Sequence, residues 1–184
     1  MKLKRGGWAL WVSVFFVVFL IVFLFFYFTL YSRDRNVQQI YLENPISNLT
    51  DSQAVEKFDE SFVTYLLYSI KAHTFLHNPP LSKELPEIIV YVDELVYNSF
   101  VEDGIVKVGK GEIESPDIKI RTTKLEAVNM LRNKDYVKES FNSGKSGVEL
   151  VAGKAVLFSK GYLNFYSELN GKSVTGNVIR IYAD

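Results

Sequence analysis

Residues 8–31 form the longest apolar run in the chain, without a charged residue, a Pro or a Gly. At about 1.5 Å per residue, a helix of this run would be about 36 Å long, which is enough to cross a hydrocarbon core of about 30 Å. Trp8 and Trp11 lie near its start and Tyr27 and Tyr31 near its end. These positions match the aromatic belts at membrane interfaces. The pattern predicts a single transmembrane helix over residues 8–31.

Two alternatives to a permanent anchor are a core helix and a cleaved signal peptide. The run is apolar on every face, which is unlike a helix packed on one side of a globular core. A signal peptide has an apolar region of about 7 to 15 residues followed by a small-residue cleavage site. Here the apolar run is longer and ends in Phe28-Thr29-Leu30-Tyr31. We therefore expect a signal anchor that stays attached.

Basic residues on the two sides of residues 8–31 predict the orientation. The N-terminal flank, residues 1–7, carries three, whereas Arg33 and Arg35 follow the helix. Because Lys and Arg accumulate on the cytoplasmic side, we expect a cytoplasmic N-terminus and an extracytoplasmic C-terminal domain. Asn48-Leu49-Thr50 is a glycosylation sequon and makes Asn48 a candidate acceptor. The chain has no Cys, so disulfides cannot stabilise this domain.

After the apolar run, residues 32–49 are mostly polar and show no sustained period, which is typical of a juxtamembrane linker. The remaining residues, 50–184, suit one globular domain. Thr50 and Gln53 form a capping-box pair at its start. Apolar residues then recur at steps of three and four up to Leu76, which predicts one long amphipathic helix.

From Glu87 the apolar period changes to two, which indicates strands. Asp103-Gly104 is a hairpin signal between two of them. The expected strands are 87–93, 95–101, 105–108, 117–121 and 147–151, with strand-like alternation again over 172–183. Further helices are expected over 123–131, 136–141 and 154–169, although the aromatic residues of the last segment would also suit strands. The predicted fold is α+β, an antiparallel sheet of about four to five strands with helices on one side.

This order of elements resembles a known family. Asp117-Ile118-Lys119-Ile120-Arg121 leads directly into a capped helix, and Phe141 to Lys145 forms a Phe-x-x-Gly-Lys motif before one more strand and a final helix. Over Thr50 to Gly171 the chain is similar to the sterol carrier protein type of lipid-binding domain. The resemblance implies an apolar tunnel between the helices and one sheet face. The N-terminal anchor, a shorter middle of the sheet and an extra C-terminal strand pair depart from that family.

The resemblance and the apolar helix faces together suggest residues for a lipid or other apolar ligand. Phe62, Leu66 and Ile70 follow one stripe, and Phe141 and Phe158 would lie opposite them. The alternative is that these side chains are simply core.

The sequence offers no metal site. His73 and His77 are four residues apart and would share a helix face, as zinc ligands can. Position 74 is Thr74, where a zinc protease needs Glu, and there is neither a Cys nor a third His. No metal or other cofactor is therefore expected.

Two further patterns resemble catalytic or nucleotide sites only superficially. Gly144-Lys145-Ser146 imitates the end of a phosphate-binding loop, but Glu139 stands where that motif needs Gly. Glu112, Glu114 and Asp117 cluster in an expected loop, where solvation explains carboxylates better than acid–base pairing. We expect a protein that is not an enzyme.

Charge narrows the range of partners. The chain balances 21 Lys and Arg against 21 Asp and Glu, so a strongly basic surface, and with it nucleic acid, is not expected. The expected partners are the lipid bilayer, an apolar ligand and other membrane proteins. Two functions follow: a membrane-anchored lipid-binding domain, or a structural or assembly subunit of an envelope complex with no small-molecule ligand.

Overall fold

The computed structural model describes residues 6–31, 42–77 and 84–170, and in the first range the side chains of residues 11–27. The chain divides into two compact units, residues 1–36 and 37–184. The predicted strands over 172–183 lie outside the described residues.

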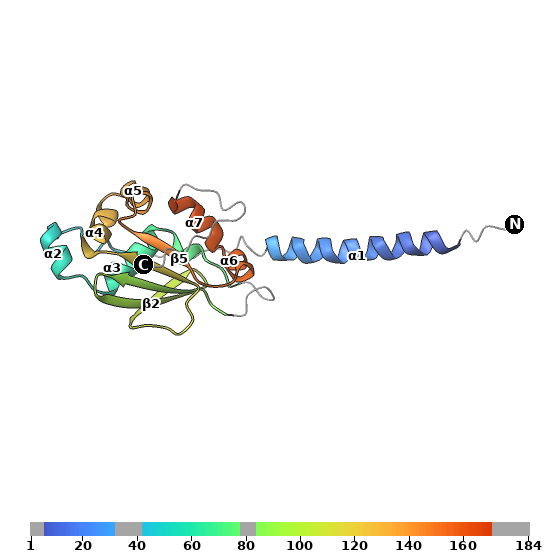
Figure 1. Ribbon diagram of the computed structural model, residues 1–184, viewed down its shortest axis with the longest axis horizontal. Helices are drawn as coiled ribbons and strands as arrows, with labels where there is room; N and C mark the ends of the chain where they lie inside the picture. The colour runs from blue at the N-terminus through green and yellow to red at the C-terminus, as the bar shows by residue number, and fades with distance from the viewer. Residues whose placement is uncertain (1–5, 32–41, 78–83, 171–184) are drawn as a thin grey trace. The chain divides into compact units, whose positions relative to one another are not determined.

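The first unit contains helix α1 (Gly6–Tyr31), drawn in blue in Figure 1. Trp11 and Tyr27 are exposed, as are the large apolar side chains between them. The side chains of Trp8 and Tyr31 lie outside the described set. No helix is long and apolar enough to cross a membrane within the described part of the chain, which in α1 comprises the side chains of residues 11–27.

The second unit is an α+β domain built on a five-stranded sheet of order β3-β2-β1-β4-β5 (Figure 1). The strands are β1 (Glu87–Val92), β2 (Leu95–Glu102), β3 (Ile105–Lys110), β4 (Ile118–Thr122) and β5 (Gly147–Leu150). The Asp103-Gly104 turn between β2 and β3 is confirmed, because both residues adopt the positive φ of a tight hairpin.

The predicted all-antiparallel sheet is wrong at one pairing. Strands β1 and β4 run parallel, with Ile88 beside Ile118, while the other three pairings are antiparallel. Residues 111–117 carry the chain from β3 past β2 and β1, so that β4 begins on the far side of β1, beside its start. The amide of Asp117 donates to the carbonyl of Glu87 at 2.9 Å and fixes this start. Strand patterns do not reveal which edge of the sheet a later strand joins.

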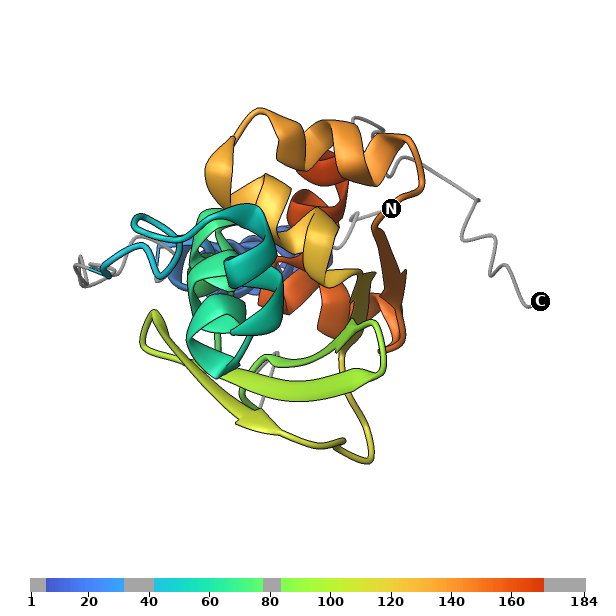
Figure 2. The same cartoon turned by 90° about the vertical axis from the view of Figure 1, so that its left-hand side faces the viewer.

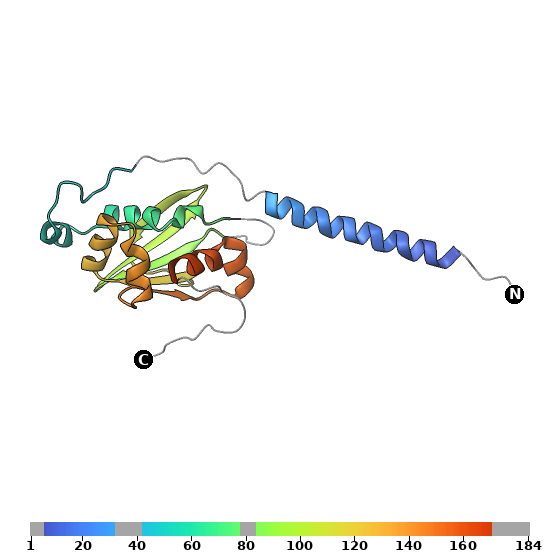
Figure 3. The same ribbon diagram turned by 90° about the horizontal axis from the view of Figure 1, so that it is seen from above.

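The helices cover one face of the sheet, as Figure 2 shows. They are α2 (Asp51–Glu56), α3 (Glu60–Ser69), α4 (Lys124–Arg132), α5 (Tyr136–Asn142), α6 (Lys154–Lys160) and α7 (Tyr162–Asn170), with the short 3-10 helix η2 (Ala72–Thr74). Helix α3 packs against β3 (Figure 3). Alternate residues of β1, Ile88, Val90 and Val92, are completely buried in the core beneath them. The helical prediction for 154–169 is confirmed, with a break at Gly161 (φ 87°).

The predicted single helix from Thr50 to Leu76 is divided into three pieces. The capping box of Thr50 and Gln53 is present at the start of α2. Asp59 then begins α3 as a second N-cap, and its Oδ1 accepts from the amide of Ser61 at 2.9 Å. Lys71, at φ 65°, separates α3 from η2. The apolar residues keep their spacing across these breaks, because each of the three pieces packs its apolar side against the core.

We expect Asp59→Ala to lower the free energy of unfolding by about 1 kcal/mol, since an N-cap side chain satisfies amides that otherwise lose their partner. Chemical denaturation of the full-length protein measures this loss. Asp103→Ala would not be a matched control because Asp103 has a positive φ, whereas Asp135→Ala is suitable: Asp135 begins α5 without a side-chain cap bond. Equal losses in Asp59→Ala and Asp135→Ala would contradict the capping role.

The domain also includes residues that the sequence assigned to the linker. Ile46 is buried in the core. The guanidinium of Arg132 donates to the carbonyls of Ile46 and Leu49 and forms an ion pair with Asp51. These residues, which precede the predicted boundary at residue 50, thus contribute contacts to the domain. Asn48 lies exposed in the turn of this segment.

Candidate functional site

Four of the five predicted ligand-contacting residues meet in one apolar layer between the helices and the sheet. Phe62, Leu66 and Ile70 project from α3 and its C-cap, and Phe141 from α5. They are 3%, 1%, 5% and 5% exposed. These four side chains thus belong to one buried core, while their contact with a ligand stays a prediction.

Phe158 is the exception, because it is 59% exposed and does not line this interior. On the short helix α6, Leu157 and Lys160 point inward and are buried. A residue adjacent to Leu157 is rotated by about 100° around the helix axis, which turns Phe158 to the solvent. The predicted inward position of Phe158 is wrong for this reason.

Aromatic rings line the apolar layer at two places. Phe58 lies 5.1 Å from Phe62 between ring centroids, next to Tyr97 of β2. Phe75 lies 4.3 Å from Tyr162 and 4.9 Å from Phe165. Such rings bury large areas and favour tilted or edge-to-face contacts. The side chains of this layer can therefore bury hydrocarbon, their own or that of a ligand.

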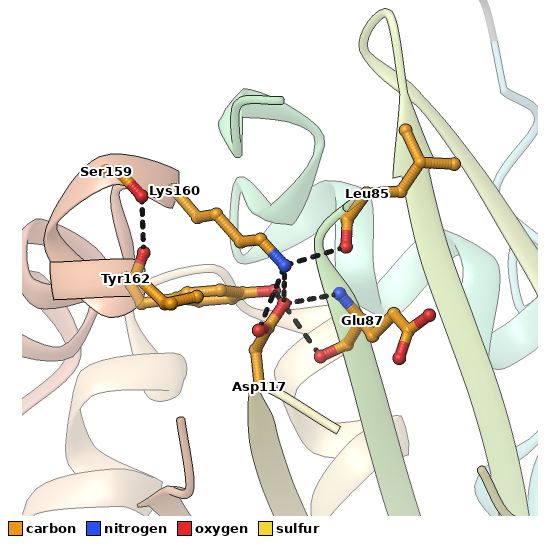
Figure 4. Close-up of polar contacts among 7 residues, drawn as sticks. Leu85, Glu87, Asp117, Ser159, Lys160 and Tyr162 are labelled. Atoms are coloured by element: carbon orange, nitrogen blue, oxygen red, sulfur yellow. Dashed lines mark hydrogen bonds and ion pairs between the residues drawn. The ribbon is translucent and has the colours of Figure 1, made fainter. Parts of the chain in front are cut away.

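A buried ion pair joins the end of α6 to the residue before β4 (Figure 4). The ammonium of Lys160, the last residue of α6, lies 2.8 Å and 3.0 Å from the two carboxylate oxygens of Asp117, which precedes β4. It also donates to the carbonyl of Leu85 at 2.9 Å. Lys160 and Asp117 are 2% and 5% exposed. All three ammonium donors of Lys160 are therefore used inside the protein.

Tyr162 and Glu87 complete this network, as Figure 4 shows. Oδ2 of Asp117 also accepts from the Tyr162 hydroxyl at 2.9 Å and from the Glu87 amide at 2.8 Å. Burial, together with the Asp117 charge, raises the pKa of Tyr162 well above its usual range, so the hydroxyl stays a donor. Burial, and again the Asp117 charge, raises the pKa of the Glu87 carboxyl. The network joins the α6–α7 junction to the starts of β1 and β4.

Asp117 does not lie in a solvated loop with Glu112 and Glu114, so the prediction is wrong for this residue. It is buried because its backbone and its side chain both bind the start of β1. The available signal was a polar residue directly before a buried strand. Lys160, at the end of an apolar helix segment, gave the matching signal, but spacing alone cannot pair residues so far apart in sequence.

The Gly144-Lys145-Ser146 segment takes part in a second internal network. Ser146 Oγ lies 2.9 Å from Ser140 Oγ and 2.8 Å from Thr122 Oγ1, and Lys145 donates to the Tyr136 hydroxyl at 2.8 Å. Gly144, at φ 76°, turns the chain after α5. The prediction of a helix end followed by a turn is confirmed, and these side chains bind other side chains of the domain.

The two histidines do not share a helix face. His73 lies in η2 and stacks on Tyr68 with ring centroids 5.2 Å apart, while His77 follows η2 and is exposed. Within the described residues, no group of three His, Cys, Asp or Glu side chains could hold a metal ion. The two residues are separated because η2 ends at Thr74, so that His73 is helical and His77 is not.

We expect His73 to make stability depend on pH. Burial, and next the nearby Lys71 charge, lowers the pKa of His73 below 6.5 in the folded state. The neutral form is thus favoured by folding, and its contribution is complete above pH 6.5 and decreases as the pH falls below that value. The free energy of unfolding of wild type and of His73→Gln, measured by denaturation at a series of pH values, should depend differently on pH just below pH 6.5. His77→Gln is the matched control, and a wild-type pH slope in His73→Gln would contradict the expectation.

Comparisons with known proteins leave the family open. No family model matches the chain, and no curated protein matches it. A solved structure named "UbiJ-SCP2 Ubiquinone synthesis protein" is similar at 16% identity and a TM-score of 0.33, covering 58% of this chain and 91% of that one. At this TM-score the similarity carries no argument about function. The α+β assignment rests on the strands and helices themselves.

Proposed function

We propose that this chain is a single-pass, membrane-anchored domain that binds a lipid or another apolar ligand next to the membrane, without catalysis. The supporting observation is the apolar layer, in which Phe62, Leu66, Ile70 and Phe141 gather between the helices and one sheet face. A hydrocarbon chain is the class of ligand that such a layer favours, because its gain on leaving water scales with apolar area.

The proposed anchor is the apolar run of residues 8–31. Its support is the absence of charge over the run and the continuous helix α1 that contains it. We propose that the basic N-terminal flank stays in the cytoplasm and that the domain faces the other side. In a host that glycosylates proteins, the exposed Asn48 would then be an acceptor. A mass increase from an attached glycan, present in wild type and lost in Asn48→Gln, tests this orientation.

A non-catalytic role is supported by the use of the buried ionisable groups. Lys160, Asp117 and Tyr162 bind one another and the backbone. A general acid or base needs a proton that a substrate can reach. In this network the protons of Lys160 and Tyr162 are directed at Asp117 and at backbone carbonyls.

Mass spectrometry of lipids retained by the full-length protein, purified in mild detergent, tests ligand binding. We expect a retained acyl lipid and a higher melting temperature when acyl lipids are added. Leu66→Trp should fill the apolar layer and abolish both effects, whereas Leu125→Trp, at an exposed position of α4, should abolish neither. A wild-type protein that carries no lipid and gains no thermal stability would overturn the proposal.

The second candidate, an assembly subunit without a small-molecule ligand, is favoured by one observation. The four layer residues are at most 5% exposed and pack in the same core as the residues around them. A domain whose interior is filled by its own side chains would show this. Affinity isolation of the full-length protein from mild detergent should then return partner subunits, and recovery of the protein alone would exclude this function.

A further inference from the structure

We infer that the outward face of α6 docks on the lipid bilayer, with Phe158 inserted at the boundary between headgroups and acyl chains. This inference rests on the membrane anchoring proposed above and adds to it the surface of the domain that meets the lipid. The occupant of this surface is thus the bilayer, and a protein partner is an alternative that the test below separates.

The exposed residues of α6 form one stripe. Lys154, Ala155 and Phe158 are exposed, and Phe158 lies four residues after Lys154 and three after Ala155, so they are neighbours on the helix surface. Val151, just before the helix, is also exposed. Apart from Lys154, the outward side of this short helix is apolar, which is unusual for a face that meets only water.

The buried side of α6 fixes the direction of this stripe. Leu157 is buried in the core, and Lys160 is held by Asp117 at 2.8 Å. Turning Phe158 inward would remove both of these contacts. Its exposure is therefore a consequence of the ion pair and of the core packing.

The chemistry of the stripe suits a bilayer interface. Residues 151–167 contain no acidic residue, so no carboxylate of this segment opposes approach to lipid headgroups. A Phe can enter the acyl boundary, while the long stem of Lys154 lets its ammonium stay at headgroup level. A side chain inserted in this way lies about 5–10 Å into the interface.

The length of chain between the proposed anchor and the domain limits how far the domain can move from the bilayer. Residues 32–41 connect the end of α1 to the first described residue of the domain, and this segment can span at most about 35 Å. A tether of this length gives a high effective concentration of the domain at the membrane. A small stripe is sufficient under these conditions, whereas it would bind weakly to a bilayer from free solution.

Single-cysteine labelling of the full-length protein in phosphatidylcholine vesicles tests the inference. The natural chain has no Cys, so Phe158→Cys and Ala155→Cys each provide one site for an environment-sensitive fluorophore. Leu125→Cys is the matched control, since Leu125 is also an apolar side chain, 53% exposed, on another helix. We expect blue-shifted emission at 158 and 155 and several-fold stronger quenching by brominated acyl chains than at 125.

Each other outcome overturns the inference in a distinct way. Water-like emission at both α6 sites, in protein that remains with the vesicles, rejects docking and leaves the anchor intact. Blue-shifted emission without quenching by brominated lipid identifies a protein contact, from a second copy or another chain. Loss of the protein from the vesicles on alkaline extraction rejects the anchor, and docking with it.

Discussion

Asp117→Leu should lower the free energy of unfolding by about 3–5 kcal/mol, the usual cost of leaving a buried charge without its partner. The Lys160 ammonium would keep only the carbonyl of Leu85, and the Glu87 amide would lose its acceptor. Water cannot readily replace the carboxylate, since Lys160 is 2% exposed. Urea denaturation of the full-length protein in detergent, monitored by far-UV circular dichroism, measures the loss.

Lys160→Met should cost less than Asp117→Leu. The carboxylate of Asp117 then still accepts from the Tyr162 hydroxyl and the Glu87 amide, and a carboxyl group can also take up a proton. In the double variant no buried charge remains, and we expect it to recover much of the stability lost by Asp117→Leu. This coupling distinguishes an ion pair from two independent structural roles.

The exposed pair of Lys71 with Glu168 provides the matched control, because it also attaches α7 to a distant segment. Glu168→Leu should change stability by at most about 1 kcal/mol, since solvent screens exposed charges. If Asp117→Leu and Glu168→Leu destabilise equally, the buried network does not hold the α6–α7 junction.

Local chemistry made much of this fold predictable. Between two apolar strands, Asp103-Gly104 favours a tight hairpin turn. The structure has this hairpin between β2 and β3. Phe62, Leu66 and Ile70 follow helical spacing and are buried on one side. Such signals depend only on neighbours in sequence, which is why they could be recognised without the structure.

Features that depend on contacts between distant segments were not predictable. The parallel pairing of β1 with β4 depends on where residues 111–117 lead the chain. The Lys160–Asp117 pair joins two segments that only the folded domain brings together. Phe158 also illustrates this limit, because an aromatic residue in an apolar helix segment predicts burial, yet Lys160 takes part in fixing the opposite orientation.

Truncation of the apolar layer should separate its two functional interpretations. Phe62→Ala is expected to cost about 3–5 kcal/mol, through lost burial and the cavity that remains. The contact with Phe58 at 5.1 Å is lost as well. Phe158→Ala, at a site 59% exposed, should change stability in detergent by at most about 0.5 kcal/mol. Chemical denaturation of both variants, with and without added acyl lipid, measures these changes.

The lipid dependence carries the functional information. A ligand that binds only the folded state adds stability that grows with its concentration. If Phe62 contacts that ligand, the gain from acyl lipid should be smaller in Phe62→Ala than in wild type, and unchanged in Phe158→Ala. If the layer is solely core, lipid should leave wild type and Phe158→Ala unaffected, and Phe62→Ala alone could gain stability, because its new cavity offers lipid a site that the native side chain fills.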